Sequence, residues 1–155
     1  MMHEHEAHQG RATFITLTYA NDYLPENFSL DKVALQLYFK RVRKHYMQQK
    51  IKYYACGEYG EKTNRPHYHI IMFGIAPNDY ERLDIKHNFW PYGHTHLGHS
   101  VEAEACAYVA KYVTKMIRSK QYSYAPRERP FQLQSQGLGK RYAQRYAQDI
   151  KKNYT

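Results

Sequence analysis

The clearest hydrophobic patterns in the chain predict three β-strands in its first half. Residues 12–19 (ATFITLTY) alternate between an apolar side and a threonine-bearing side, which is the period of a strand. Residues 51–59 are rich in aromatic and β-branched side chains that favour strands. Residues 68–73 form an apolar run, and the polar stretch 60–66 before it has turn chemistry. The second and third strands are therefore predicted to form a hairpin.

Helical spacing appears between the first two predicted strands. Apolar side chains recur from Leu35 to Tyr46 at intervals of three and four residues, and Ser29 or Asp31 can cap the helix, which is predicted to end near Gln48. Weaker patterns predict the rest of the chain. They indicate a short helix at 77–86, a strand near 96–102, a helix at 104–120, an extended or loop segment at 121–136 and a basic helix at 138–152.

The length of 155 residues predicts a single domain, long enough to bury a core without disulfides. Residues 1–11 are polar and are predicted to be flexible. Cys56 and Cys106 both lie in apolar surroundings and are predicted to be reduced, buried thiols. No apolar run approaches the length of a membrane span, and the N-terminus lacks a hydrophobic signal core, so neither membrane insertion nor export is expected.

The positive charge of the chain is concentrated in its C-terminal third. Residues 1–110 hold 12 Lys/Arg and 12 Asp/Glu, whereas residues 111–152 hold 11 Lys/Arg and only two acidic residues, so this part carries the whole net charge of +9. A basic segment in a chain with 17 tyrosines is typical of a nucleic-acid partner, because cations bind phosphates and aromatic rings stack on bases. The alternative is that the charge only keeps the protein soluble. Residues 121–155 are interpreted as a basic C-terminal extension.

Three side chains in the predicted hairpin favour a metal site. His67 and His69 are two residues apart on one strand and therefore project from the same face. Glu58 lies near the end of the preceding strand, where it can approach both imidazoles. Two imidazoles and one carboxylate leave coordination positions of a divalent ion open for water or a phosphate oxygen, which is typical of catalytic sites. The alternative is a pair of structural histidines without a metal.

A second motif lies in the predicted helix at 104–120. A helical turn of about 100° per residue places Tyr108, Lys111, Tyr112 and Lys115 in one stripe, while the apolar residues fall on the side that packs. A phenol is a weak nucleophile at neutral pH, and a nearby lysine ammonium favours the reactive phenolate. The stripe and the metal site together suggest attack of a tyrosine oxygen on a DNA phosphodiester. Surface tyrosines without a catalytic role are the alternative.

The motifs of the chain resemble those of the HUH endonuclease superfamily, and within it the replication initiation proteins of the small single-stranded DNA phages, the microviruses. The resemblance is carried by FITLTY (14–19), RPHYHIIMFG (65–74) and YVAKYVTK (108–115), and it spans most of residues 12–120. It implies an α+β fold with a central antiparallel sheet of about five strands flanked by helices, related to RNA-recognition-motif folds. It also implies rolling-circle initiation, in which a Mg²⁺- or Mn²⁺-dependent nick leaves the enzyme on the 5′ phosphate.

The resemblance assigns roles to individual residues. His67 and His69 become metal ligands with Glu58 as the third ligand, Tyr108 and Tyr112 become nucleophiles, and Lys111 and Lys115 activate them or contact phosphate. Further DNA contacts are expected from basic side chains along the chain, namely Lys62, Arg65, Arg118, Lys120, Arg127, Arg129, Lys140 and Arg141. The implied partners are single-stranded DNA at an origin and host helicase and polymerase, with a monomer acting in the cytoplasm of an infected bacterium. Family members usually have more sequence at both ends.

Two other functions remain open at this point. A non-catalytic binder of single-stranded nucleic acid would use the sheet and tyrosines as stacking platforms. A metal-independent RNA nuclease would use His67 and His69 as acid and base. A covalent adduct between protein and DNA distinguishes the first interpretation from both.

Overall fold

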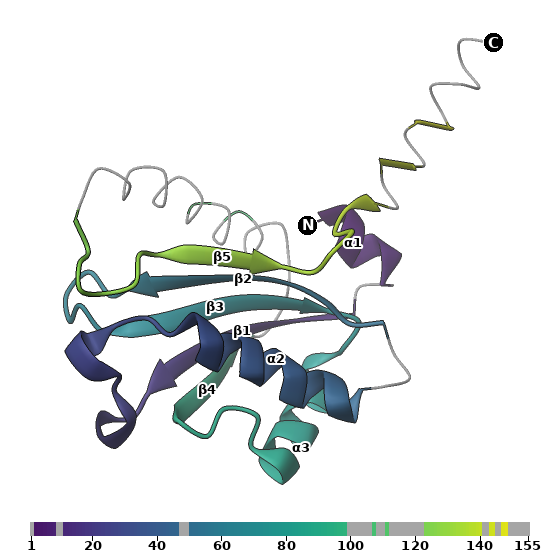
Figure 1. The fold of residues 1–155 in the computed structure, drawn as a ribbon. Helices are drawn as coiled ribbons and strands as arrows, with labels where there is room; N and C mark the ends of the chain where they lie inside the picture. Colours follow the sequence, from purple (N-terminus) through teal and green to yellow (C-terminus); the bar gives the residue numbers. More distant parts are fainter. Residues whose placement is uncertain are drawn as a thin grey trace.

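The fold is a five-stranded antiparallel sheet with helices packed beside it. The computed structural model describes residues 2–8, 11–46, 50–98, 107, 111, 123–140, 143–144 and 147–148. Its strands lie in the order β4-β1-β3-β2-β5, and each neighbouring pair is antiparallel. Along the chain the elements are α1 (Met2–Ala7), β1 (Ala12–Tyr19), two short 3-10 turns (Asn21–Tyr23 and Glu26–Phe28), α2 (Lys32–His45), β2 (Lys52–Tyr59), β3 (Pro66–Phe73), α3 (Pro77–His87), β4 (Gly93–Gly98) and β5 (Phe131–Gln134) (Figure 1). The predicted α+β class with about five antiparallel strands is confirmed.

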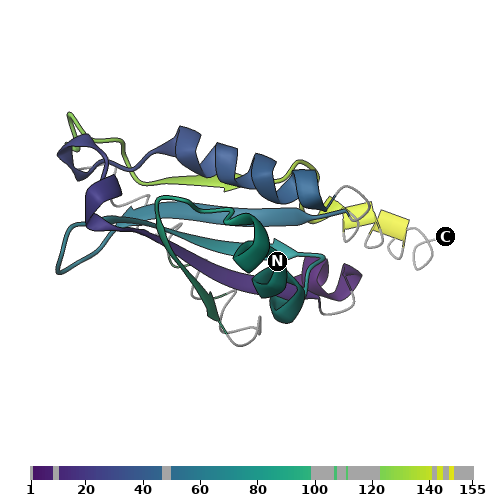
Figure 2. The same ribbon diagram turned by 90° about the horizontal axis from the view of Figure 1, so that it is seen from below.

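Helix α2 covers one face of the sheet (Figure 2). The carboxylate of Asp31 caps its N-terminus by accepting a hydrogen bond of 2.9 Å from the Ala34 amide, as the sequence predicted. The buried stripe of the helix, which includes Leu35 and Tyr38, packs against the apolar side of β1 and the matching side of β3. This packing forms the main core, because the helix and the sheet each present one apolar face to the other.

The opposite face of the sheet holds a smaller apolar cluster and the polar residues of the candidate site. Ala12, Tyr54, Cys56, Ile71 and Phe73 form this cluster. Strand β3 contributes to both faces and is buried along most of its length, since it lies at the centre of the sheet. Its central position explains why the sequence of β3 reads as a continuous apolar run broken only by histidines.

Two elements differ from the sequence-based prediction. Strand β4 begins at Gly93, earlier than the predicted 96, and this glycine is required because a Cβ there would clash with the Thr18 carbonyl oxygen of β1. Strand β5 lies within residues 121–136, which were predicted to be an extended or loop segment without a strand. It pairs with β2 over only four residues, from Tyr54↔Gln134 to Gly57↔Phe131. So short a strand gives no period of its own, and its pairing with β2 creates it.

Helix α1 lies where no regular element was predicted, because its alternating histidines and glutamates give it no apolar stripe. The Glu4 side chain, only 1% exposed, accepts hydrogen bonds from Lys52 Nζ at 3.0 Å and from the Gly139 amide at 2.9 Å. Burial alone would raise the pKa of this carboxyl, but the bonds from Gly139 and Lys52 lower it below its ordinary value. Glu4 therefore ties the first helix to β2 and to the segment that follows β5.

Replacing Tyr46 by phenylalanine is expected to leave the free energy of unfolding unchanged or to raise it by up to about 1 kcal/mol. The Tyr46 hydroxyl is buried at the end of α2 and has no hydrogen-bond partner among the described residues, so its removal relieves a desolvation cost. The matched variant Tyr38→Phe is expected to cost about 1–2 kcal/mol, because the Tyr38 and Tyr80 hydroxyls share a buried hydrogen bond of 2.7 Å. Urea denaturation of both variants checks this, and equal destabilisation would contradict it.

Candidate metal centre on the face opposite helix α2

The β2–β3 hairpin brings three metal-ligand side chains together. In its register, Glu58 lies opposite His67 and Cys56 lies opposite His69. Residues directly opposite each other in an antiparallel pair project from the same face, so Glu58, His67 and His69 all lie on the face away from α2. Strand β1 borders them on the other side, with Thr16 opposite His69.

The three side chains are close enough to hold one ion. Glu58 Oε1 lies 2.8 Å from His67 Nε2 and 3.4 Å from His69 Nε2. One donor atom from each residue falls within 4.8 Å of the other two, and within the described chain this is the single group of three or more potential ligands. Their side chains are between 8% and 18% exposed. The site is therefore a half-buried pocket of two nitrogens and a carboxylate on the sheet.

Neighbouring groups orient both imidazoles. The His67 Nδ1 atom lies 3.2 Å from the Arg65 carbonyl oxygen, which can only accept a hydrogen bond, so Nδ1 must carry the proton. The His69 Nδ1 atom lies 3.1 Å from the Thr16 hydroxyl. Each ring therefore turns its Nε2 toward Glu58. Metal-bound histidines typically hold the second nitrogen in this way, which fixes the tautomer that presents a lone pair to the ion.

The electrostatics of the site also suit a divalent cation. Burial raises the pKa of the Glu58 carboxyl, but hydrogen bonds from His67 and His69 and their positive charge outweigh it and lower the pKa to about 2. Glu58 is thus an anion throughout the neutral range. Burial raises the pKa of the neighbouring Cys56 thiol to about 12, and the Glu58 charge adds to this, so the thiol stays protonated and is a poor ligand. The residues present therefore fit an oxygen- and nitrogen-ligated ion.

Comparison with known proteins adds a second kind of observation. The family profile of replication-associated proteins of the ORF2 type matches residues 12–117, which is more than half of the chain and includes the metal-ligand motif. The chain belongs to this replication-associated protein family. The membership confirms the resemblance to replication proteins of small phages that the sequence motifs indicated.

Three curated phage proteins illustrate the similarity. The replication-associated protein ORF4 of Chlamydia phage 1 is 31% identical over 131 residues, covering 72% of this chain and 32% of that protein. The replication-associated protein ORF2 of Spiroplasma virus 4 is 33% identical over 153 residues, covering 83% and 46%. The replication-associated protein VP4 of Bdellovibrio phage phiMH2K is 25% identical over 155 residues, covering 86% and 48%. The chain thus spans less than half the length of these relatives.

Two further findings bound the comparison. No solved structure matches the chain. Among the helices that the structure describes, none is both long and apolar enough to cross a bilayer.

The predicted nucleophiles of this replication-associated protein stay a prediction. Tyr108, Tyr112 and Lys115 lie outside the described residues, as do the predicted DNA contacts Arg118, Lys120 and Arg141 and the second cysteine, Cys106. Lys111 is described and is an exposed helical residue.

The other predicted DNA contacts differ in their surroundings. Arg65 donates hydrogen bonds of 2.9 Å to Asn21 Oδ1 and to the Tyr19 carbonyl oxygen, so it holds the turn after β1 against the β2–β3 hairpin. The guanidinium of Arg127 lies 4.2 Å from the centre of the Tyr59 ring. The remaining predicted contacts in the described part of the chain are exposed, namely Lys62, Arg129 and Lys140. Arg65 is therefore engaged within the protein, while the exposed cations are accessible to a phosphate backbone.

Sequence reasoning missed one residue of the site. Thr16 contacts His69 from the neighbouring strand, although nothing in its own motif marks it as part of a metal centre. The signal was present in the alternation of residues 12–19, which places the threonines on one side of β1. What the sequence lacked was the register that sets this side next to the histidines.

Proposed function

We propose that the protein is a metal-dependent endonuclease and strand transferase that nicks single-stranded DNA at an origin and initiates rolling-circle replication. The observation that carries the proposal is the convergence of Glu58, His67 and His69 into one donor set in a chain of the replication-associated family. A site of this kind leaves room for a phosphate oxygen, and replication proteins act on DNA. Because the chain covers less than half of its relatives, this activity is proposed for the described domain and its tyrosine motif.

The proposed reaction conserves the energy of the phosphodiester bond. The phenol oxygen of Tyr108 or Tyr112 attacks the scissile phosphorus, the bond from phosphorus to the 3′ oxygen breaks, and that oxygen takes up a proton. The products are a 5′-phosphotyrosine and a free 3′-hydroxyl. Attack by another hydroxyl on the phosphotyrosine reverses the step and joins strands, and two tyrosines one helical turn apart allow two successive transfers. A bound Mg²⁺ or Mn²⁺ would supply charge neutralisation at the phosphate.

The residues of this chain prepare the site for that reaction. The Arg65 carbonyl and the Thr16 hydroxyl orient the two imidazoles, and Glu58 stays ionised between them. Lys111 and Lys115 are proposed to favour the phenolate form of the tyrosines or to contact the phosphate.

The tyrosine closest in sequence to the two histidines is unsuited to act as the nucleophile. Tyr68 separates His67 from His69 but projects to the α2 face, where its hydroxyl bonds to Tyr19 and to the Asp31 backbone. Burial raises its pKa to about 12. The nucleophile of the proposed reaction is therefore sought outside the hairpin, which is consistent with the tyrosine motif at 108–115.

Single-stranded DNA at the origin is the proposed substrate, and the basic residues of the C-terminal third, including Arg127 and Arg129, are proposed to bind its backbone. Host helicase and polymerase are the proposed later partners. The proposed setting is the cytoplasm of an infected bacterium, with the protein acting as a monomer.

The proposal is tested by mixing the protein with labelled single-stranded oligonucleotides that tile the origin region, in Mn²⁺ or in EDTA. The expected result is a protein–DNA adduct that survives denaturation and forms only with the metal ion. Gel retardation without any adduct, unchanged by EDTA, would instead identify a binding protein. Cleavage in EDTA without an adduct would identify metal-independent nuclease chemistry. Mass mapping of the adduct peptide then locates the modified tyrosine.

A further inference from the structure

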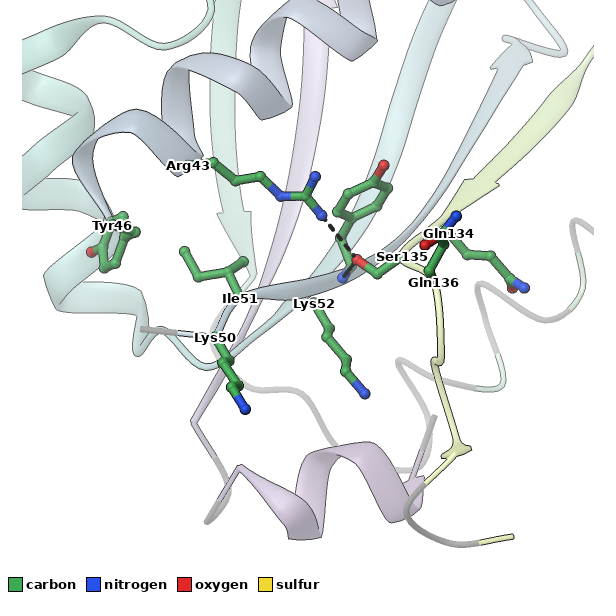
Figure 3. A pocket seen from close by; sticks show the side chains of 9 residues that line it. Arg43, Tyr46, Lys50, Ile51, Lys52, Gln134, Ser135 and Gln136 are labelled. Carbon is green, nitrogen blue, oxygen red and sulfur yellow. Dashed lines mark hydrogen bonds between the residues drawn. The ribbon is translucent and has the colours of Figure 1, made fainter. Parts of the chain in front are cut away.

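A basic pocket lies at the end of the sheet far from the metal centre. It has a volume of about 560 Å³ and is lined by residues from the end of α2, the beginning of β2 and the segment at the end of β5, namely Arg43, Tyr46, Lys50, Ile51, Lys52, Tyr53, Gln134, Ser135 and Gln136. Figure 3 shows the side chains of Lys50 and Lys52 extending in the same direction, with Arg43 reaching over from α2. None of these nine lining residues is acidic.

The cations of the pocket are held in different ways. Lys52 is paired with the buried carboxylate of Glu4, and its charge is thereby compensated. Arg43 is positioned by an uncharged set of groups: its guanidinium lies 5.2 Å from the centre of the Tyr53 ring and donates a hydrogen bond of 3.4 Å to Ser135 Oγ. Lys50 is exposed, and no carboxylate among the described residues pairs with it or with Arg43. Two cations therefore remain uncompensated in one pocket.

The lining favours a phosphate backbone over other anions. Glutamine amides and hydroxyl groups beside the cations supply neutral donors, a combination that binds phosphate oxygens. The Tyr53 ring is already stacked between Arg43 and Phe39, whose ring centre lies 3.6 Å away, so it offers no free face to a base. The pocket is thus suited to reading charge and not sequence.

We propose that this pocket binds the phosphate backbone of single-stranded DNA at a distance from the cleavage site. Lys52 and Glu58 are six residues apart on β2, which corresponds to about 20 Å along an extended strand. A DNA strand held at the metal centre can reach the pocket only with nucleotides that flank the nick. The identity of the ligand as DNA rests on the proposed function, whereas the anion site itself rests on the geometry.

The test measures binding of a labelled thymidine homopolymer of about 30 nucleotides in EDTA, by fluorescence anisotropy over a range of salt concentrations. Arg43→Gln and Lys50→Gln are each expected to weaken binding about three- to tenfold and to reduce the slope of log affinity against log salt by about 0.7. The control Lys86→Gln removes an equal charge from an exposed position on α3, outside the pocket lining, and is expected to change binding less than about twofold. Equal effects from all three variants would overturn the proposal.

Two further arms locate the contact and identify the ligand. Photocrosslinking with an iodouridine-substituted homopolymer is expected to label the peptide that spans residues 41–53 in the wild type, and labelling confined to other peptides would overturn the proposal. Thymidine monophosphate presents the same phosphate chemistry as the polymer. If it competes as well as the polymer, per mole of phosphate, the pocket is a mononucleotide site and the backbone proposal is wrong.

The same variants separate this proposal from the nickase proposal. Adduct formation in Mn²⁺ with affinity and salt slope unchanged in Arg43→Gln and Lys50→Gln would overturn the pocket alone. A loss of affinity in these variants, with no adduct in any protein including the wild type, would overturn the nickase alone. Thermal denaturation confirms that the glutamine variants are folded.

Discussion

Replacing His69 by alanine is expected to slow formation of the covalent DNA adduct by about three orders of magnitude, which corresponds to about 4 kcal/mol of transition-state stabilisation. The imidazole is only 8% exposed, its Nε2 faces Glu58 at 3.4 Å, and its Nδ1 contacts Thr16, so no other side chain of the hairpin can take its place. DNA affinity is expected to change less than about threefold, because phosphate contacts lie elsewhere on the chain. Single-turnover adduct formation and anisotropy measure the two quantities separately.

A graded control comes from Thr16. The Thr16→Val variant keeps both ligands and loses only the hydrogen bond to His69 Nδ1, so a loss of about 10- to 100-fold is expected, between wild type and His69→Ala. Raising the Mn²⁺ concentration is expected to recover part of the Thr16→Val activity, since the variant weakens the ion's hold without removing a ligand. Equal losses of cleavage and of DNA affinity in His69→Ala would count against the metal assignment.

Replacing both Tyr108 and Tyr112 by phenylalanine is expected to abolish the adduct, because phenylalanine has no oxygen to attack the phosphorus. Tyr108→Phe alone is expected to leave some cleavage, since the second phenol lies one helical turn away in the predicted helix. DNA affinity should stay close to that of the wild type in both variants. Denaturing gels that quantify adduct and nicked product at saturating protein provide the measurement.

The matched control for the tyrosine variants is Tyr124→Phe. The Tyr124 ring stacks near Tyr59 at a centre-to-centre distance of 5.9 Å, a contact that phenylalanine preserves, so full activity is expected. Persistent adduct in the Tyr108/Tyr112 double variant would place the nucleophile elsewhere, and the modified peptide would then show whether Tyr122 or Tyr124 carries the DNA.

Side-chain order along the strands determined most of the metal centre in advance. The His-x-His spacing in β3 requires both imidazoles to share a face, because a strand has a period of two. The hairpin with its short polar turn brought Glu58 opposite His67, and the alternation of β1 and the apolar stripe of α2 were equally legible. These features could be predicted because each depends on local periodicity and on contacts between neighbouring elements.

Features that depend on long-range pairing emerged only from the tertiary structure. Strand β5 exists because residues 131–134 pair with β2, the Thr16 contact exists because β1 lies beside β3, and the basic pocket joins Arg43 to Lys50 and Ser135 across a wide span of sequence. Glu4, in a segment without any apolar pattern, is buried because Lys52 and the Gly139 amide meet it there. A single sequence specifies the faces of its elements through their periods, but sheet order and register are set by the free energy of the whole packed chain.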